Sequence, residues 1–213
     1  MRSAGWMAYW HARKASGFDM PETPAQRFRE QFFSVVQRQE FAGPLKQASQ
    51  RANLGAWTEA LTGAVVVTSE AVGWKASAKG HKADLLPIRR SEYLALDVMA
   101  FPKGERRWRF PVAVMELENS SREDQIAYSL WKVLAVNAEW RAVFCYRERS
   151  DQIPVLVRHL REEVVEAMAL SGRVGLGGQT TLIVGTRSES ETFPYGYFGW
   201  WNLDTNTGKF ERV

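Results

Sequence analysis

The sequence predicts an α/β fold in which a mixed central sheet is flanked by helices, with a helical segment at the N-terminus. Three observations lead to this prediction. The first third of the chain repeats apolar residues at helical spacing. The middle changes to the alternating period of strands on either side of a turn. The rest alternates strand-like and helix-like segments, which is typical of helices packed against a sheet.

The N-terminal helices come first. Residues 24–41 carry apolar side chains three and four positions apart, and residues 45–66 do the same after Pro44. We therefore divide the chain into an N-terminal helical segment, residues 1–50, and an α/β domain, residues 51–213.

A hairpin follows in the middle of the chain. Residues 92–101 are expected to form one strand, residues 102–109 a connection with Lys103-Gly104 at its centre, and residues 110–118 the returning strand. The remaining expected elements are a helix over 122–136, a strand over 140–147, a helix over 155–172, a strand over 180–186 and an aromatic, strand-like segment over 195–204.

Composition limits the class of protein. The 213 residues are 45% hydrophobic and carry a net charge of +4, a mildly basic balance that permits a nucleic-acid partner without demanding one. The single cysteine, Cys145, lies in an apolar run, so we expect a buried structural thiol in a reducing compartment. No apolar run reaches the length of a membrane helix or a signal peptide, so we expect a cytoplasmic protein without membrane association.

Three carboxylates carry the strongest chemical signal. Glu116 and Glu118 share one face at the end of an apolar strand, since strand residues alternate between faces. Asp97 is the lone charge in the preceding strand and would lie across the hairpin from them. Carboxylates that converge on one point repel each other unless a cation joins them, and hard oxygen ligands favour Mg²⁺ or Mn²⁺.

The order of these residues resembles the PD-(D/E)XK nucleases, which have the restriction-endonuclease-like fold. The resemblance covers about residues 57–147 and rests on four stretches, YLALDVMAF, VAVMELEN, SLWKVL and WRAVFCYR. It implies a restriction-endonuclease-like core in which Asp97 and Glu116 bind the metal. By the same resemblance Glu118 takes the place of the family's lysine, and Glu59 matches a position where some members have a further glutamate near the metal.

The glutamate at the lysine position is the main departure from the family. That lysine is thought to orient or deprotonate the attacking water, and Lys132 on the next helix is a candidate to replace it. Arg106, Arg107 and Arg109 lie in the hairpin connection, which we expect to be next to the carboxylates, where they could bind phosphates. A solvated turn is the alternative for these arginines.

We therefore expect a nuclease that uses Mg²⁺ or Mn²⁺ to hydrolyse phosphodiester bonds, with DNA favoured over RNA and a homo-oligomer left open. The alternative is a catalytically degenerate module of the same fold that binds nucleic acid or a protein partner. In a third interpretation the protein is a small-molecule or interaction domain whose carboxylates are structural: Glu116 and Glu118 could be an exposed strand end, and Asp97 could pair with an arginine such as Arg109. Trp200 and Trp201 could stack bases, although packing in the core is the simpler role.

Overall fold

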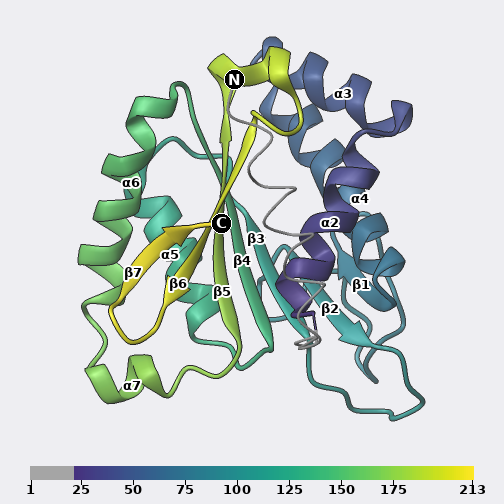
Figure 1. Ribbon diagram of the computed structural model, residues 1–213. Helices are drawn as coiled ribbons and strands as arrows, with labels where there is room; N and C mark the ends of the chain where they lie inside the picture. The colour runs from purple at the N-terminus through teal and green to yellow at the C-terminus, as the bar shows by residue number, and fades with distance from the viewer. Residues whose placement is uncertain (1–21) are drawn as a thin grey trace, which may run out of the picture.

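A single mixed sheet organises the chain (Figure 1). The computed structural model describes residues 22–213, and its seven strands lie side by side in chain order. They are β1 (Trp74–Ala78), β2 (Val98–Pro102), β3 (Ala113–Leu117), β4 (Trp140–Arg147), β5 (Gln179–Thr186), β6 (Phe198–Asp204) and β7 (Lys209–Arg212). Strands β3, β4 and β5 are parallel to one another, and every other neighbouring pair is antiparallel. The predicted α/β class with a mixed sheet is confirmed.

Helices cover both faces of this sheet (Figure 1). They are α2 (Pro24–Val36), α3 (Gln39–Gln50), α4 (Leu54–Ala71), α5 (Glu123–Leu134), α6 (Ile153–Leu160) and α7 (Leu170–Val174), with short turns η1 (Ser150–Gln152), η2 (Arg161–Val165) and η3 (Arg187–Thr192). Helices α2, α3 and α4 bury their apolar side chains against one face. Helices α5 and α6 do so against the other. Residues 1–21 of the predicted N-terminal segment lie outside the described residues.

The N-terminal helix α2 is built into the main core. Thr23 caps its first turn, with the Thr23 hydroxyl accepting from the Gln26 amide and the Gln26 side chain accepting from the Thr23 amide. Its helical stripe then buries Phe32 completely. The Phe32 ring lies 5.5 Å from that of Phe144 in β4 and 5.9 Å from that of Trp200 in β6. The described part of the N-terminal segment therefore packs directly on the sheet.

We expect Phe32→Ala to lower the free energy of unfolding by about 3–5 kcal/mol, because it removes a fully buried ring from contacts with two strands. Gln31→Ala, one position away and exposed, should change it by less than about 0.5 kcal/mol. Urea unfolding followed by circular dichroism measures both. If the two variants unfold alike, α2 is not part of the core.

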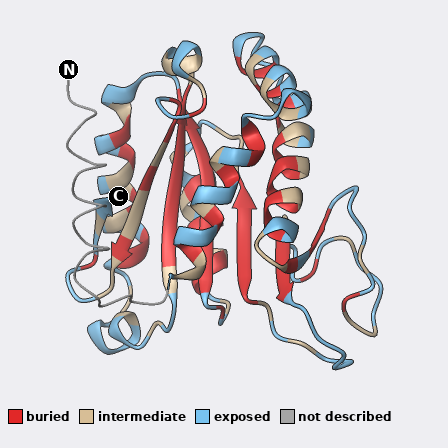
Figure 2. Ribbon diagram, turned by 45° about the vertical axis from the view of Figure 1, so that its right-hand side comes forward, coloured by how far each residue is buried: buried red, intermediate tan, exposed pale blue. Residues whose placement is uncertain are grey.

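The middle of the sheet is buried on both faces (Figure 2). All five residues of β3 and all eight of β4 are buried, as is expected for parallel strands covered by helices on both sides. Cys145 in β4 is buried as predicted, and its burial raises the pKa of the thiol to about 12. No helix within residues 22–213 is both long and apolar enough to cross a membrane.

The predicted hairpin is confirmed, with a shorter first strand. Strands β2 and β3 pair antiparallel, with Val98 opposite Met115. Residues 93–97 form turns instead of strand, and Leu94 and Ala95 have left-handed backbone angles, with φ of +56° and +54°. If the same pairing is continued by one residue beyond Val98 and Met115, Asp97 lies opposite Glu116.

Three predicted helices are interrupted. The helix expected over 24–41 ends at Val36, and α3 begins at Gln39. The helix expected over 45–66 breaks between α3 and α4, where Ala52 has a φ of +51° and Asn53 caps the new helix by accepting from the Ala56 amide. The helix expected over 155–172 gives way to the π-helical turn η2 and ends before α7. The edge strands β1 and β7 were not predicted, because β1 is short and β7 is largely exposed and polar.

Candidate functional site

A buried glutamate defines the candidate site. Glu116 lies in β3 near the carboxyl edge of the parallel strands, and only 3% of its surface is exposed. Its side chain lies on the face covered by α5, the same face to which the hairpin register directs Asp97. An ionised carboxylate in such a place needs a positive partner, since burial removes its hydration.

Lys132 of α5 is that partner. Its Nζ lies 2.7 Å from Glu116 Oε2 and donates to the backbone carbonyl of Ala95 at 3.1 Å. The Lys132 side chain is 19% exposed and that of Glu116 5% exposed, so the pair is largely shielded from water. The ammonium group also lies 5.5 Å from the centroid of the Tyr128 ring. Lys132 therefore ties α5 to both β3 and the turn before β2.

The electrostatics of Glu116 are unusual. Its pKa is raised to about 7, chiefly by burial and in smaller part by the nearby charge of Asp97, against the lowering effect of Lys132. One carboxylate oxygen, Oε1, is buried and makes no hydrogen bond of normal geometry. A buried acceptor without a donor costs free energy, so this atom is suited to receive a proton or a cation.

Asp97 is fixed by the backbone. Its Oδ2 accepts from the Leu117 amide at 2.7 Å, which ties the turn before β2 to the end of β3. The left-handed residues Leu94 and Ala95 lie three and two positions before it, and Ala95 supplies the carbonyl that Lys132 binds. Such backbone angles are unfavourable for residues other than glycine and often accompany functional sites. The other Asp97 oxygen has no hydrogen-bond partner within residues 22–213.

Glu118 does not join Asp97 and Glu116 at a common point, so the prediction of three converging carboxylates is wrong. Strand β3 ends at Leu117, and Glu118 turns toward the start of the next connection. Its Oε1 accepts from the Ser120 amide at 2.7 Å and its Oε2 from the Ser129 hydroxyl at 3.1 Å. Glu118 still lies on the α5 side of the sheet, as strand alternation predicts, because the Ser129 hydroxyl lies against both Glu118 and Glu116. The error arises because the Glu118 oxygens accept from Ser120 and Ser129.

Two carboxylates, those of Asp97 and Glu116, are available as metal ligands at this site. No group of three or more histidine, cysteine, aspartate or glutamate side chains in the described part of the chain could hold one. Mg²⁺ is often bound by one or two carboxylates, with water and substrate phosphates as its other ligands. The free oxygen of Asp97 and the unpartnered Oε1 of Glu116 fit that donor set.

The other predicted residues lie elsewhere. Glu59 is exposed on α4 and makes no hydrogen bond or ion pair within residues 22–213. Its neighbour Thr58 is the residue that approaches the site, through a hydrogen bond from Asn119 Nδ2 to the Thr58 hydroxyl.

The predicted arginine cluster is at the wrong end of the hairpin. Arg106, Arg107 and Arg109 follow the end of β2, whereas Asp97 precedes its start. The connection thus leaves β2 at the end opposite the carboxylates, and the expectation that these arginines adjoin them is wrong. Arg109 Nε donates to the Arg106 carbonyl at 3.1 Å, so the alternative pairing of Asp97 with Arg109 is also wrong.

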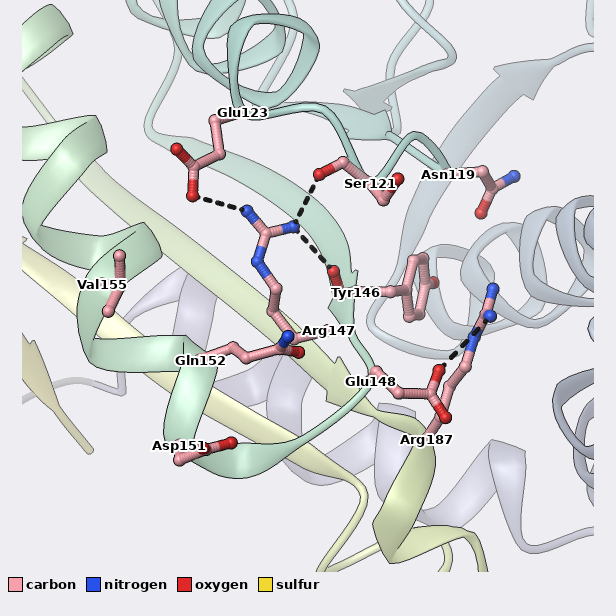
Figure 3. Close-up of a pocket in the computed structure, with 10 residues that line it drawn as sticks. All are labelled: Asn119, Ser121, Glu123, Tyr146, Arg147, Glu148, Asp151, Gln152, Val155 and Arg187. Atoms are coloured by element: carbon pink, nitrogen blue, oxygen red, sulfur yellow. Dashed lines mark hydrogen bonds and ion pairs between the residues drawn. The ribbon is translucent and has the colours of Figure 1, made fainter.

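A pocket of about 530 Å³ lies between the connection after β3 and the ends of β4 and β5 (Figure 3), and neither Asp97 nor Glu116 lines it. Its two arginines are paired: Arg147 lies 3.4 Å from Glu123, and Arg187 lies 3.6 Å from Glu148. Arg147 also donates to the Ser121 and Tyr146 carbonyls. The charges of this pocket are satisfied by its own side chains.

Sequence analysis missed Ser129. Its buried hydroxyl lies 3.1 Å from Glu118 Oε2 and 3.4 Å from Glu116 Oε2, between the two glutamates. The signal was present, because Ser129 precedes Lys132 by three residues and such residues share a helix face.

Comparison with known proteins finds no match: no protein family, no curated protein and no solved structure corresponds to this chain.

The metal-free protein should lose stability as the pH rises from about 4.5 to 7. The unfolded chain releases the Glu116 proton near its ordinary pKa of 4.5 and the folded protein near 7. The folded state therefore binds more protons in this window. Its free energy of unfolding should fall by about 2–3 kcal/mol relative to Glu116→Gln across that range.

Urea unfolding in EDTA at several pH values measures this difference. Glu70→Gln on the exposed surface of α4 is the control and should follow wild type. A difference between wild type and Glu116→Gln that stays constant with pH would contradict the raised pKa.

Proposed function

We propose that the protein hydrolyses phosphodiester bonds with the help of Mg²⁺ or Mn²⁺, using Asp97, Glu116 and Lys132. The observation that carries the proposal is the buried ion pair between Lys132 and Glu116, with the charge of Asp97 close enough to act on Glu116. Asp97 and Glu116 occur in the order of the PD-(D/E)XK nucleases that the sequence resembles, and Lys132 on α5 would replace the lysine that the family has where Glu118 stands.

Asp97 and Glu116 would hold the cation. When bound, such an ion offsets negative charge on a phosphate and lowers the pKa of water. The two carboxylates are held in place before binding, Asp97 by the Leu117 amide and Glu116 by Lys132. Held ligands lose little conformational freedom on binding, which favours a defined site.

Lys132 would bind a water molecule or the substrate next to the carboxylates of Asp97 and Glu116. It forms the ion pair with Glu116, and 19% of its side chain is exposed. A lysine ammonium has three donors, of which Glu116 and the Ala95 carbonyl take two. The third can orient a water molecule or a phosphate oxygen, the role expected of the family's lysine.

A second candidate function is a binding module without catalysis. Glu118 occupies the family's lysine position and is bound to Ser120 and Ser129, and two carboxylates converge instead of three. In that case the ion pair between Lys132 and Glu116 would only stabilise the packing of α5 on the sheet. Activity measurements separate the two functions.

Purified protein should nick plasmid DNA with Mg²⁺ or Mn²⁺ and lose the activity in EDTA. Asp97→Asn and Glu116→Gln should each lower the rate by at least about 100-fold, since each removes a negatively charged ligand. Lys132→Met should lower it by about 100-fold, as expected for a group that assists proton transfer. Glu118→Gln should stay within about threefold of wild type, because its oxygens face Ser120 and Ser129.

RNA is the second substrate in the same assay. Activity that survives EDTA, or that survives in Asp97→Asn and Glu116→Gln, would refute the proposed site. A wild type without activity on either polymer would favour the binding module.

Metal binding can be tested without a substrate. Mg²⁺ at ten times its dissociation constant should raise the melting temperature of wild type by about 3–5 °C, because it binds only the folded state. Glu116→Gln should show little of this rise, and Glu70→Gln should show all of it. An equal response of wild type and Glu116→Gln would place the ion elsewhere.

A further inference from the structure

A second pocket, with unbalanced charge, lies between α6 and the hairpin of β6 and β7. We call it the α6–β7 pocket. Its volume is about 640 Å³, within the range of small-molecule sites. The residues that line it include Ile153, Val157 and Arg158 from α6, Trp201 from β6, and Lys209, Phe210 and Arg212 from β7. It lies on the sheet face covered by α5 and α6, near the edge opposite β1.

Three cations line this pocket without acidic partners. Arg158, Lys209 and Arg212 make no ion pair within residues 22–213. A fourth, Arg161, is held by Glu162 at 3.3 Å and Glu166 at 3.1 Å. One acidic residue, Glu189, lines the pocket. This differs from the pocket at the ends of β4 and β5, where each arginine has a glutamate.

Trp201 forms part of the pocket wall and supports one of these cations. The Arg212 guanidinium carbon lies 5.6 Å from the centroid of the Trp201 ring, directly across the β6–β7 ladder. A side chain at Gly199 would leave no room for the indole, since a Cβ there would lie 2.4 Å from its Cη2 atom. Gly199 thus lets Trp201 lie against the strand, where its ring positions Arg212.

We propose that the α6–β7 pocket binds a nucleoside polyphosphate. Arg158 reaches the space from α6, and Lys209 and Arg212 reach it from β7, so the cations meet a ligand from two sides. Arginine and lysine are the side chains that bind phosphate oxygens. Ile153, Val157 and Phe210 add an apolar wall suited to a planar base. Binding requires neither the carboxylates nor a metal, so it is independent of the proposed hydrolysis.

The test uses the full chain in EDTA and a fluorescent N-methylanthraniloyl derivative of ATP, followed by anisotropy. Wild type should bind the probe, and the double variant Lys209→Gln/Arg212→Gln should bind it about tenfold more weakly or worse. The matched control is Lys82→Gln/Arg89→Gln, which removes the same two charges from an exposed connection outside the pocket. It should bind as wild type does. Arg158→Gln removes the cation on the α6 side of the pocket. It replaces the double variant in this test if the double variant does not fold.

Competitors identify the ligand. Unlabelled ATP should displace the probe at a lower concentration than tripolyphosphate or adenosine, because the proposed site binds both phosphates and base. The concentrations of an oligothymidylate and of ATP are compared per phosphate group. If the oligothymidylate displaces the probe at the lower concentration, the proposal is overturned in favour of a nucleic-acid groove. Absence of binding to wild type, or equal losses in the pocket variant and the control, would also overturn it.

Discussion

The ion pair between Lys132 and Glu116 is the interaction on which the carboxyl edge of the sheet depends. Glu116 sits in a strand with helices over both faces, where a charged carboxylate is costly. Lys132 offsets that cost and at the same time binds the Ala95 carbonyl, which holds the strained turn before Asp97. Removing one partner of a buried pair leaves the other uncompensated. The pair thus links α5, β3 and the start of β2 in one arrangement.

The two apolar layers make this arrangement rigid. Aromatic side chains from α2, β4 and β6 fill one side of the sheet, while α5 and α6 close the other. Polar groups at the ends of such strands are held in place by the packed core beneath them. The incomplete hydrogen bonding of Glu116 Oε1 is therefore a property of the folded state that the core maintains.

The fold class and half of the site could be predicted from the sequence because they follow from local periodicity. Alternation in the hairpin placed Asp97 and Glu116 on one face, and helical spacing made Lys132 available above them. Errors arose where local contacts decide the outcome: Glu118 shares the face of Glu116 as predicted, but its oxygens accept from Ser120 and Ser129, which strand alternation does not predict. The arginines of the hairpin connection are near the carboxylates in sequence yet at the other end of the strands. The edge strands β1 and β7 were missed because short or exposed strands carry little alternation.

The most direct test of this account is the titration of the Glu116 side chain itself, followed by the ¹³C chemical shift of its carboxyl carbon. The assignment comes from the spectrum of Glu116→Gln, in which that signal is missing. The account predicts a pKa of about 7 in EDTA and a marked decrease when Mg²⁺ is added, because a bound cation favours the ionised form. A Glu116 carboxyl that titrates near 4.5, and does so equally with and without Mg²⁺, would contradict it.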